Sequence, residues 1–434
     1  MNFLKKIFSP TILTISLLLL IYTFYKSEII WDGNKGNYFK TYYLISSILI
    51  CFSIITFFIK DKIKEYLIII CISLIVSLYL FEGYLTLKEQ TSEQLYEKQT
   101  GKKWDTRNKL EIYIDLKKTN NDIVISTPST EFFDKKYPTF PMSGLSNSET
   151  INCNENGYYS TYMSDRYGFN NPDEVWESNE IEYMLVGDSF THGSCVNRPY
   201  DIASVLRKLT KTDVLNLGYG HNGPLLEFAT LKEFLNKKPK KILWLYFEGN
   251  DLSDLNFELE NEILNNYLLD ENFSQNIILK QNQVDKLIEN RILDLDNYRK
   301  DLSRKENLKY KILKFIRLDK TKRILSHKNE ILQKEKLLEI IKKANDLSIK
   351  NGSKFFFVYL PSYERYNKFV NQKNYKDYFF IISTLRNLKI PIIDIHSDVI
   401  SKNPKSFFPF GLTGHYNEKG YLEVSKYIKQ FTIN

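Results

Sequence analysis

Three apolar runs near the N-terminus constrain most strongly what this 434-residue chain can fold into. They cover residues 7–25, 42–59 and 66–85. Each approaches the roughly 20 residues that a helix needs to cross the hydrocarbon core of a bilayer. Such a run must be helical there, because lipid offers the backbone no hydrogen-bond partners. No small-x-small cleavage site follows the first run, so the sequence predicts a membrane anchor of three retained helices over residues 1–87.

The lysines that flank these runs predict the orientation of the chain. Two lysines precede the first run and three fill the link between the second and the third (Lys5 and Lys6; Lys60, Lys62 and Lys64). Lysine and arginine are in excess on cytoplasmic flanks, so both of these flanks should be cytoplasmic. An odd number of spans then places the rest of the chain outside. We expect a multi-pass protein of the inner or plasma membrane whose extracytoplasmic part lies in a compartment that permits disulfides.

The formal net charge of +8 does not by itself indicate nucleic-acid binding. The lysines are scattered and interleaved with Asp and Glu, as on the solvated faces of helices. Four cysteines without a C-x-x-C spacing are too few for a disulfide scaffold or a zinc ribbon. No cluster of His, Asp or Cys has metal-ligand spacing, so we expect no metal and no organic cofactor.

Beyond the anchor, short apolar runs alternate with helical patterns, and this alternation predicts the fold class. The runs cover residues 181–186, 214–217, 242–247, 355–360 and 390–395, and the helical patterns include residues 203–209, 225–235 and 331–349. Short buried strands that alternate with helices are typical of an α/β fold with a parallel sheet. Ligands bind such sheets at the carboxyl ends of the strands. Three of the runs end in clusters of Gly, Ser, Asn and Asp, so we expect the chemistry there.

Two segments fall outside this alternation. Residues 88–150 are polar and mixed, with a helical pattern near 104–116 and an extended, proline-containing stretch at 128–141, and we interpret them as a connector. Residues 257–338 have helical periodicity and no proline. They are too many for an ordinary connection between neighbouring elements. We therefore expect a helical insertion in a domain of residues 151–434, serving as a lid or a docking arm.

Ser189 and His415 are the candidate nucleophile and base. Ser189 follows an apolar strand at a turn where a helix can begin, and the amino end of a helix favours developing negative charge. A serine hydroxyl needs a base, which is usually histidine. His415 lies in a glycine-containing loop just before a terminal helix and could fold back over Ser189, whereas His192 is too close along the chain.

Four sequence blocks resemble those of the GDSL/SGNH hydrolases. They are Gly187-Asp188-Ser189-Phe190, the glycine block at residues 218–223, Gly249-Asn250-Asp251, and the block containing His415. Residues 164–172 also resemble the lead-in of membrane-anchored members. The resemblance covers residue 181 to the C-terminus except the insertion. It implies an SGNH-like, flavodoxin-like parallel sheet.

The resemblance also implies roles for these residues. Ser189 would attack an ester carbonyl while His415 removes its proton. The oxyanion would be held by the amide of Ser189, the Asn250 side chain and an amide of the glycine block. Either Gly220 or His221, which occupies the usual glycine position, could supply that last donor. Asp188 and Asp251, in the same blocks, are expected to support these groups.

One departure from the family pattern concerns the acid that orients the histidine. The family has an aspartate three residues before the histidine, where this chain has Leu412. His415 would then work in a dyad or take a carboxylate from elsewhere. Asp394 and Asp398 are candidates at the end of a strand, and the third member stays unassigned.

Three functions fit this sequence. The first is a membrane-anchored serine esterase that acts on acyl esters, in particular O-acetyl esters, of a cell-surface glycan. The second is an O-acyltransferase that acylates a surface polysaccharide through the same acyl-enzyme. The third is a non-catalytic, glycan-binding membrane protein, because fold does not imply function.

Cys153 and Cys195 are the only cysteines in the extracytoplasmic part. A disulfide between them would close a loop of about forty residues, worth about 4 kcal/mol by chain entropy. It would also bring the entering chain beside Ser189. The alternative is two separate thiols. A disulfide requires the two Cα atoms to lie within about 7 Å of each other.

The lysine pattern predicts a topology that reporter fusions can test. Alkaline phosphatase, which is active only outside the cytoplasm, should be active when fused after Asn434. The same enzyme inserted between the second and third apolar runs should be inactive, because that link is expected to be cytoplasmic. The opposite pair of results would reverse the orientation.

Overall fold

The computed structural model describes residues 2–33, 36–133, 137–302, 308–325, 333–367 and 375–433. These residues form two compact units. One unit contains Met1–Glu89 and Leu308–Leu325, and we call it the anchor unit. The other contains Gln90–Asn307 and Ser326–Asn434. We call it the catalytic unit because it carries Ser189 and His415, the residues that the sequence predicts to be catalytic.

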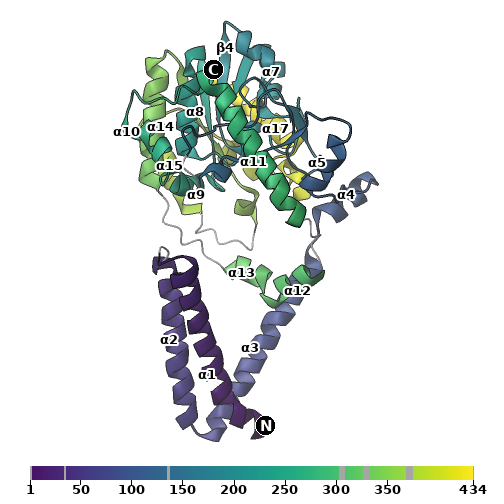
Figure 1. Ribbon diagram of the computed structural model, residues 1–434, viewed down its shortest axis with the longest axis vertical. Helices are drawn as coiled ribbons and strands as arrows, with labels where there is room; N and C mark the ends of the chain where they lie inside the picture. The colour runs from purple at the N-terminus through teal and green to yellow at the C-terminus, as the bar shows by residue number, and fades with distance from the viewer. Residues whose placement is uncertain are drawn as a thin grey trace. The chain divides into compact units, whose positions relative to one another are not determined.

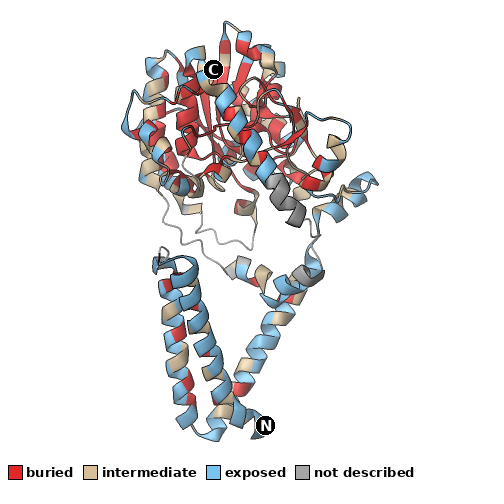
Figure 2. Ribbon diagram, in the orientation of Figure 1, coloured by how far each residue is buried: buried red, intermediate tan, exposed pale blue. Residues whose placement is uncertain are grey.

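The anchor unit is built on helices α1 (Asn2–Phe24), α2 (Gly36–Phe58) and α3 (Asp61–Lys88). A π-helical turn, Tyr25–Ile30, extends α1. Three helices are long and apolar enough to cross a membrane, as the sequence predicts. Figure 2 shows that most residues on these helices are exposed. Because those exposed side chains are largely Leu, Ile, Phe and Val, the unit is suited to a lipid environment.

The catalytic unit is built on a five-stranded sheet in the order β5-β4-β6-β7-β8. Figure 1 shows strand β4 among the helices of this unit. The strands are β4 (Ile181–Gly187), β5 (Asp213–Asn216), β6 (Lys241–Phe247), β7 (Lys354–Leu360) and β8 (Ile392–Asp394). All neighbouring strands are parallel. In chain order the strands run 2-1-3-4-5, which is the flavodoxin-like order. The predicted α/β class is therefore confirmed, and the order reverses at β4, the strand that leads into Ser189.

Both faces of this sheet are covered by helices, which explains why its strands read as continuous apolar runs. Successive side chains of a strand point to opposite faces. Met184 and Val186 accordingly join a core with α8 (Pro224–Phe234) and α14 (Lys334–Lys350). Tyr183 and Leu185 join a second core with α7 (Ile202–Thr210) and α17 (Glu418–Ile433). The sheet is thus fixed between two apolar layers, and its strand ends are held firmly.

Residues between the anchor and β4 form a smaller layer of their own. Helices α4 (Ser92–Thr100) and α5 (Lys109–Lys117) precede a three-stranded sheet in the order β1-β2-β3. Its strands are β1 (Val124–Ile125), β2 (Glu149–Ile151) and β3 (Thr161–Met163). Leu110, Ile112 and Tyr113 of α5 pack on this sheet in a separate apolar cluster. This layer carries the loop between β2 and β3, which enters the site described below.

The helical insertion is divided between the two units. Helices α9 (Asp251–Glu258), α10 (Glu262–Leu269) and α11 (Gln281–Leu302) belong to the catalytic unit. Val284, Ile288 and Ile292, four residues apart on α11, are buried in its core. Helices α12 (Leu308–Ile316) and α13 (Asp319–Leu325) belong to the anchor unit instead.

The lead-in segment at residues 164–172 ties the ends of β4 and β5 together. Its centre is the buried carboxylate of Asp165, which accepts hydrogen bonds from two backbone amides and from the side chains of Asn171 and Trp176. Asn171 also donates to the carbonyl of Asn216 at 2.8 Å, at the end of β5. Asn170 donates to the carbonyl of His192 at 2.9 Å, in the turn after β4.

We predict that Asp165→Ala destabilises the catalytic unit strongly. The change leaves buried donors without an acceptor, and each such donor costs about 1–3 kcal/mol. The midpoint of thermal unfolding, followed by circular dichroism on the full chain in detergent, should fall by several degrees. Asp173→Ala is the matched control, because the carboxylate of Asp173 is partly exposed and accepts only from the backbone amide and the guanidinium of Arg166, and exposed pairs of this kind contribute little. Equal midpoints for the two variants would contradict the role of Asp165.

Candidate active site

The turn after β4 presents Ser189 at the carboxyl edge of the sheet. Strand β4 ends at Gly187, and the short helix α6 (Ser189–His192) begins immediately after Asp188. Asp188 is the N-cap of this helix, and its buried carboxylate accepts the amide of Phe190 at 2.9 Å. Burial raises the pKa of Asp188 to about 6, and the Phe190 hydrogen bond acts in the opposite direction. The nucleophile is therefore held by its own neighbours at a strand-to-helix turn.

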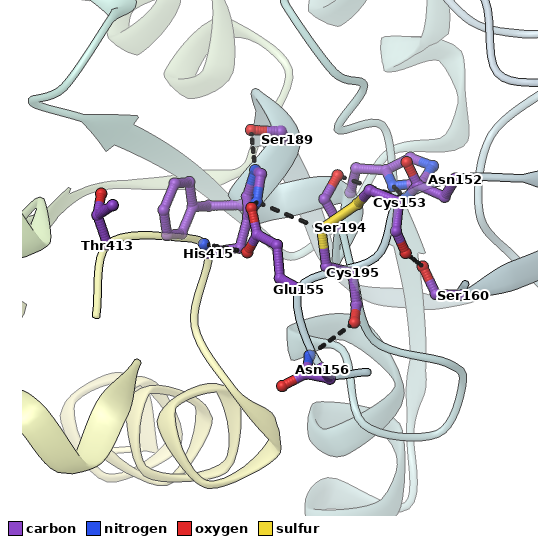
Figure 3. A network of polar contacts seen from close by, with 12 residues as sticks. Asn152, Cys153, Glu155, Asn156, Ser160, Ser189, Ser194, Cys195, Thr413 and His415 are labelled. Atoms are coloured by element: carbon purple, nitrogen blue, oxygen red, sulfur yellow. Dashed lines mark hydrogen bonds and ion pairs between the residues drawn. A yellow bond between two sulfur atoms is a disulfide. The ribbon is translucent and has the colours of Figure 1, made fainter. Parts of the chain in front are cut away.

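His415 lies against Ser189, as Figure 3 shows. The Nε2 atom of His415 is 2.9 Å from Ser189 Oγ. Its Nδ1 atom is 3.0 Å from Oε1 of Glu155, and its backbone amide donates to Oε2 of the same carboxylate at 2.6 Å. Since a carboxylate can only accept, the proton sits on Nδ1 and Nε2 is left as an acceptor for the serine hydroxyl. The three residues thus form a continuous Ser–His–acid chain.

Glu155 is the member of this chain that the sequence analysis left unassigned. It lies in the loop between β2 and β3, far in sequence from the block that contains His415. The two aspartates considered as candidates have other partners. Asp394 accepts Tyr378 Oη at 2.5 Å and the amide of Ser397, and Asp398 accepts Tyr427 Oη at 2.7 Å. The sequence offered one signal for Glu155. It follows Cys153 by two residues, and the predicted disulfide brings Cys153 near Ser189.

A disulfide holds the loop that carries Glu155. Cys153 and Cys195 are bonded, with their Cα atoms 4.9 Å apart. Cys195 follows Ser189 by six residues, so the bond joins the Glu155 loop to the segment after the nucleophile. Asn156 strengthens this link by donating to the carbonyl of Cys195 at 2.9 Å. The Sγ atom of Cys195 lies 3.6 Å from His415 Nδ1, so the disulfide is also a wall of the site.

The loop that carries His415 is shaped to meet this carboxylate. A Cβ atom on Gly414 would lie 2.7 Å from Oε2 of Glu155, so a larger residue would push the two loops apart. Aromatic rings brace the same junction, with Tyr96 of α4 5.6 Å from Trp104 and 6.0 Å from Phe410. Asn154, next to Glu155, donates to the carbonyl of Asp105 at 3.1 Å. The layer before β4 therefore holds the acid in place.

The electrostatics of the pair favour a charged acid beside a basic imidazole. Burial of His415 works against its protonation, but the charge of Glu155 and its hydrogen bond outweigh burial, so the pKa of His415 lies above its ordinary value. Burial would raise the pKa of Glu155, yet His415 lowers it overall through its charge and its hydrogen bonds. Both pKa shifts thus come from the attraction between Glu155 and His415, which strengthens when the imidazole gains a proton.

Two of the residues expected to hold an oxyanion, Gly220 and Asn250, follow the strands on either side of β4. A Cβ atom on Gly220 would lie 4.0 Å from the Cβ of Ser189 and would meet nothing else within 4 Å, so this glycine leaves open space beside the nucleophile. Asn250 follows β6, whose neighbour in the sheet is β4. The rings of Phe190 and Phe247 stack at 4.0 Å between these two strand ends.

Asn250 and Asp251 fold the end of β6 into α9. The side-chain amide of Asn250 donates to Asp254 at 2.6 Å, which uses one of its two N–H bonds. Asp251 is buried and accepts the amide of Phe247 at 2.8 Å. Burial raises the pKa of Asp251 well above its ordinary value. These contacts give Asp251 a structural part in the turn that presents Asn250.

Two further histidines lie near the site without joining the chain. His192 is buried between Tyr162 and Tyr219, and burial lowers its pKa to about 3. It therefore stays neutral. His221 is exposed, and Ser129 donates to its carbonyl at 3.2 Å. His327 lies outside the described residues.

Among the described residues, one group of three potential metal ligands lies close together, and it consists of Cys153, Cys195 and His415. The two sulfur atoms are bonded to each other. Since metal sites use the thiolate, this group is not a ready ligand set.

Solved structures similar to this chain include a lipolytic protein of the G-D-S-L family from Desulfitobacterium hafniense, a GDSL-like lipase from Bacteroides thetaiotaomicron and an acetyl xylan esterase. The first is 12% identical with a TM-score of 0.33, and the match covers 57% of this chain and 98% of that one. The second is 12% identical with a TM-score of 0.30, covering 57% and 85%. The third is 11% identical with a TM-score of 0.32, covering 58% and 98%.

No protein-family model matches the chain, and no curated protein matches it either. The sequence blocks also occupy corresponding places in the fold. The first three blocks follow β4, β5 and β6, neighbours in a sheet of flavodoxin-like order, and the block containing His415 contacts the first of them.

We predict that Glu155→Gln lowers the pKa of His415 and the rate of any reaction that uses it as a base. The variant removes the negative charge that holds that pKa above its ordinary value of about 6.5. Activity that needs neutral His415 is lost as pH falls through its pKa. The acid limb of the kcat/KM profile should therefore move to lower pH in the variant. The plateau should drop by about 10²-fold or more, because the imidazolium loses its partner.

The control for this experiment is Glu418→Gln, a change of the same kind on an exposed glutamate three residues after His415. Its pH profile should match that of the wild type. An unmoved acid limb in Glu155→Gln would show that Glu155 does not act on His415.

Proposed function

We propose that the protein is a membrane-anchored serine esterase that hydrolyses acyl esters, in particular O-acetyl esters, of a cell-surface glycan. The observation that carries the proposal is the hydrogen-bonded chain from Glu155 through His415 to Ser189. The same chain argues against a purely binding role, because a binding site does not require an acid, a base and a nucleophile in series.

In the proposed reaction, Ser189 Oγ attacks the carbonyl carbon of the ester and its proton passes to His415 Nε2. The imidazolium that forms is stabilised by Glu155, whose pKa is lowered by the same interaction. The negative charge that develops on the carbonyl oxygen is met by donors around Ser189, namely its amide, the amide of Gly220 and the side chain of Asn250. His415 then protonates the leaving alcohol, which leaves an acyl group on Ser189.

Water completes the proposed cycle. His415 takes a proton from a water molecule that attacks the acyl-enzyme, and the acid leaves as Ser189 recovers its proton. A sugar hydroxyl in place of water would transfer the acyl group to that sugar by the same steps. The proposal of a surface glycan as substrate rests on the orientation predicted from the lysine pattern, which places the catalytic unit outside the cytoplasm.

An esterase assay on the full chain in detergent tests the proposal. We expect hydrolysis of p-nitrophenyl acetate, and we expect Ser189→Ala or His415→Ala each to remove nearly all of it. The double variant should be hardly worse, because members of one relay are not additive. Asn250→Ala should lower kcat by about 10²–10³, the usual effect of losing an oxyanion donor.

His396→Ala serves as the control for the loss of a histidine, because His396 contacts Tyr366 and not Ser189. Its rate should stay near that of the wild type. A wild-type rate in His415→Ala would overturn the assignment of the base. The glycan is tested by incubating the protein with an O-acetylated polysaccharide and measuring free acetate. If acetyl groups pass from a donor ester to the glycan and no free acetate appears, the protein is an acyltransferase and not an esterase.

A further inference from the structure

One segment of the helical insertion, Leu308–Leu325, packs on the third helix of the anchor unit. Helices α12 and α13 pack on α3 within the anchor unit, near the C-terminal end of α3. The hydroxyl of Tyr79 donates to the carbonyl of Ile316 at 3.0 Å, and the rings of Tyr79 and Phe315 lie 5.7 Å apart. One turn further along α3, Gly83 faces the ring of Phe315.

Glu82 fixes α13 to the same part of α3. This carboxylate is only 1% exposed, although it lies on a helix whose other side chains are mostly apolar. It accepts the amides of Lys320 and Thr321 at 3.0 and 2.8 Å and the hydroxyl of Thr321 at 2.7 Å. Burying a carboxylate without hydrogen-bond donors costs free energy. Helix α13 supplies donors to Glu82 that α3 does not provide.

The contacts on α3 lie at the level where a spanning helix leaves the hydrocarbon. The charged start of α3 ends at Glu65, and a helix rises about 1.5 Å per residue. Tyr79 and Gly83 are therefore about 21 and 27 Å along the axis from Glu65. The hydrocarbon core is about 30 Å thick. Whatever touches these residues lies just inside the boundary between acyl chains and headgroups.

Helix α12 presents an apolar face that the anchor unit covers only in part, where Phe315 packs on Tyr79. Ile312, Leu313, Phe315 and Ile316 are 48%, 37%, 36% and 54% exposed. Positions three and four apart are neighbours on a helix, so these four residues share one face. Lys314, two residues from both Ile312 and Ile316, points elsewhere. The segment that follows carries Arg317 and Lys322, and also Lys320, whose ammonium pairs with Glu89.

We infer that α12 lies in the bilayer surface at the C-terminal end of α3, with its apolar face against the lipid acyl chains. Its level is set by the contacts with Tyr79, Glu82 and Gly83, and at that level the surrounding medium is lipid. An exposed apolar face next to a cluster of basic side chains is the pattern of a helix bound in the interface, where cations meet lipid phosphates. The inference rests on the proposal that α3 spans the membrane.

This position gives the insertion a role as a docking arm. The chain passes between the two units at three places, after residues 89, 307 and 325. A helix held in the lipid surface between the second and third of these crossings gives the chain a membrane attachment besides its three apolar helices.

Spin labels on the full chain in bilayers of phosphatidylethanolamine and phosphatidylglycerol test this inference. Cys51→Ala and Cys71→Ala first remove the free thiols. Single changes Ile312→Cys and Ile316→Cys then place a nitroxide on the apolar face of α12. Oxygen concentrates in lipid and a nickel chelate in water, so both labels should collide with oxygen several-fold more, relative to nickel, than a label in water.

Two matched positions define the scale. Leu293→Cys labels a leucine that is 60% exposed on α11 in the catalytic unit, where we expect a label in water. Leu74→Cys labels a leucine that is 58% exposed near the middle of α3, where we expect a label in lipid. Labels at 312 and 316 that match Leu293 while Leu74 is in lipid would overturn the inference and leave the anchor intact.

Two other outcomes would also overturn it. A label at Leu74 in water would refute the spanning role of α3 and the position of α12 with it. Dipolar broadening between labels at Ile316, lost on dilution with unlabelled chain, would show that a second copy of the protein covers the face in place of lipid.

Discussion

The two hydrogen bonds from His415 to the carboxylate of Glu155 set the arrangement of the site. They fix the imidazole through both its ring and its backbone, so Nε2 faces Ser189 Oγ. The carboxylate can do this because a disulfide and an aromatic brace hold its loop from two sides. Glu155 belongs to the small layer before β4, so that layer is part of the site as well as a link to the anchor. Its sheet and helices bring a carboxylate to His415, whose own sequence block has Leu412 where the resemblance would place an aspartate.

Much of the fold could be predicted from the sequence, because the strands that carry the site are buried on both faces. Continuous apolar runs that end in Gly-Asp-Ser and Gly-Asn-Asp predicted β4 and β6. They also predicted that Ser189 and Asn250 follow these strands at the same edge of the sheet. Glu155 could not be predicted in this way. Its position depends on a loop between two strands of three residues each, whose pairing leaves no clear periodic signal. Cys153 was the one available clue, because a disulfide to Cys195 carries its neighbours to the nucleophile.

The insertion shows a second limit of sequence patterns. Helical periodicity predicts helices over residues 257–338, but it does not say what each helix packs against. Helix α11 buries Ile288 in the catalytic core, whereas α13 gives Thr321 to Glu82 of the anchor. Glu82 offers a hint, since a carboxylate within an apolar helix needs a partner from elsewhere in the chain. One insertion thus contributes helices to both compact units of the chain.

Activation of Ser189 by His415 and Glu155 is the property on which the proposed activity depends most. Labelling with a fluorophosphonate probe, read by mass spectrometry of the Ser189 peptide, measures that activation without knowledge of the natural substrate. The wild type should carry one probe, on Ser189, and the labelling rate should fall by about 10²-fold or more in both His415→Ala and Glu155→Gln. Failure of Ser189 to react in the wild type, or equal labelling rates in all three proteins, would contradict the account.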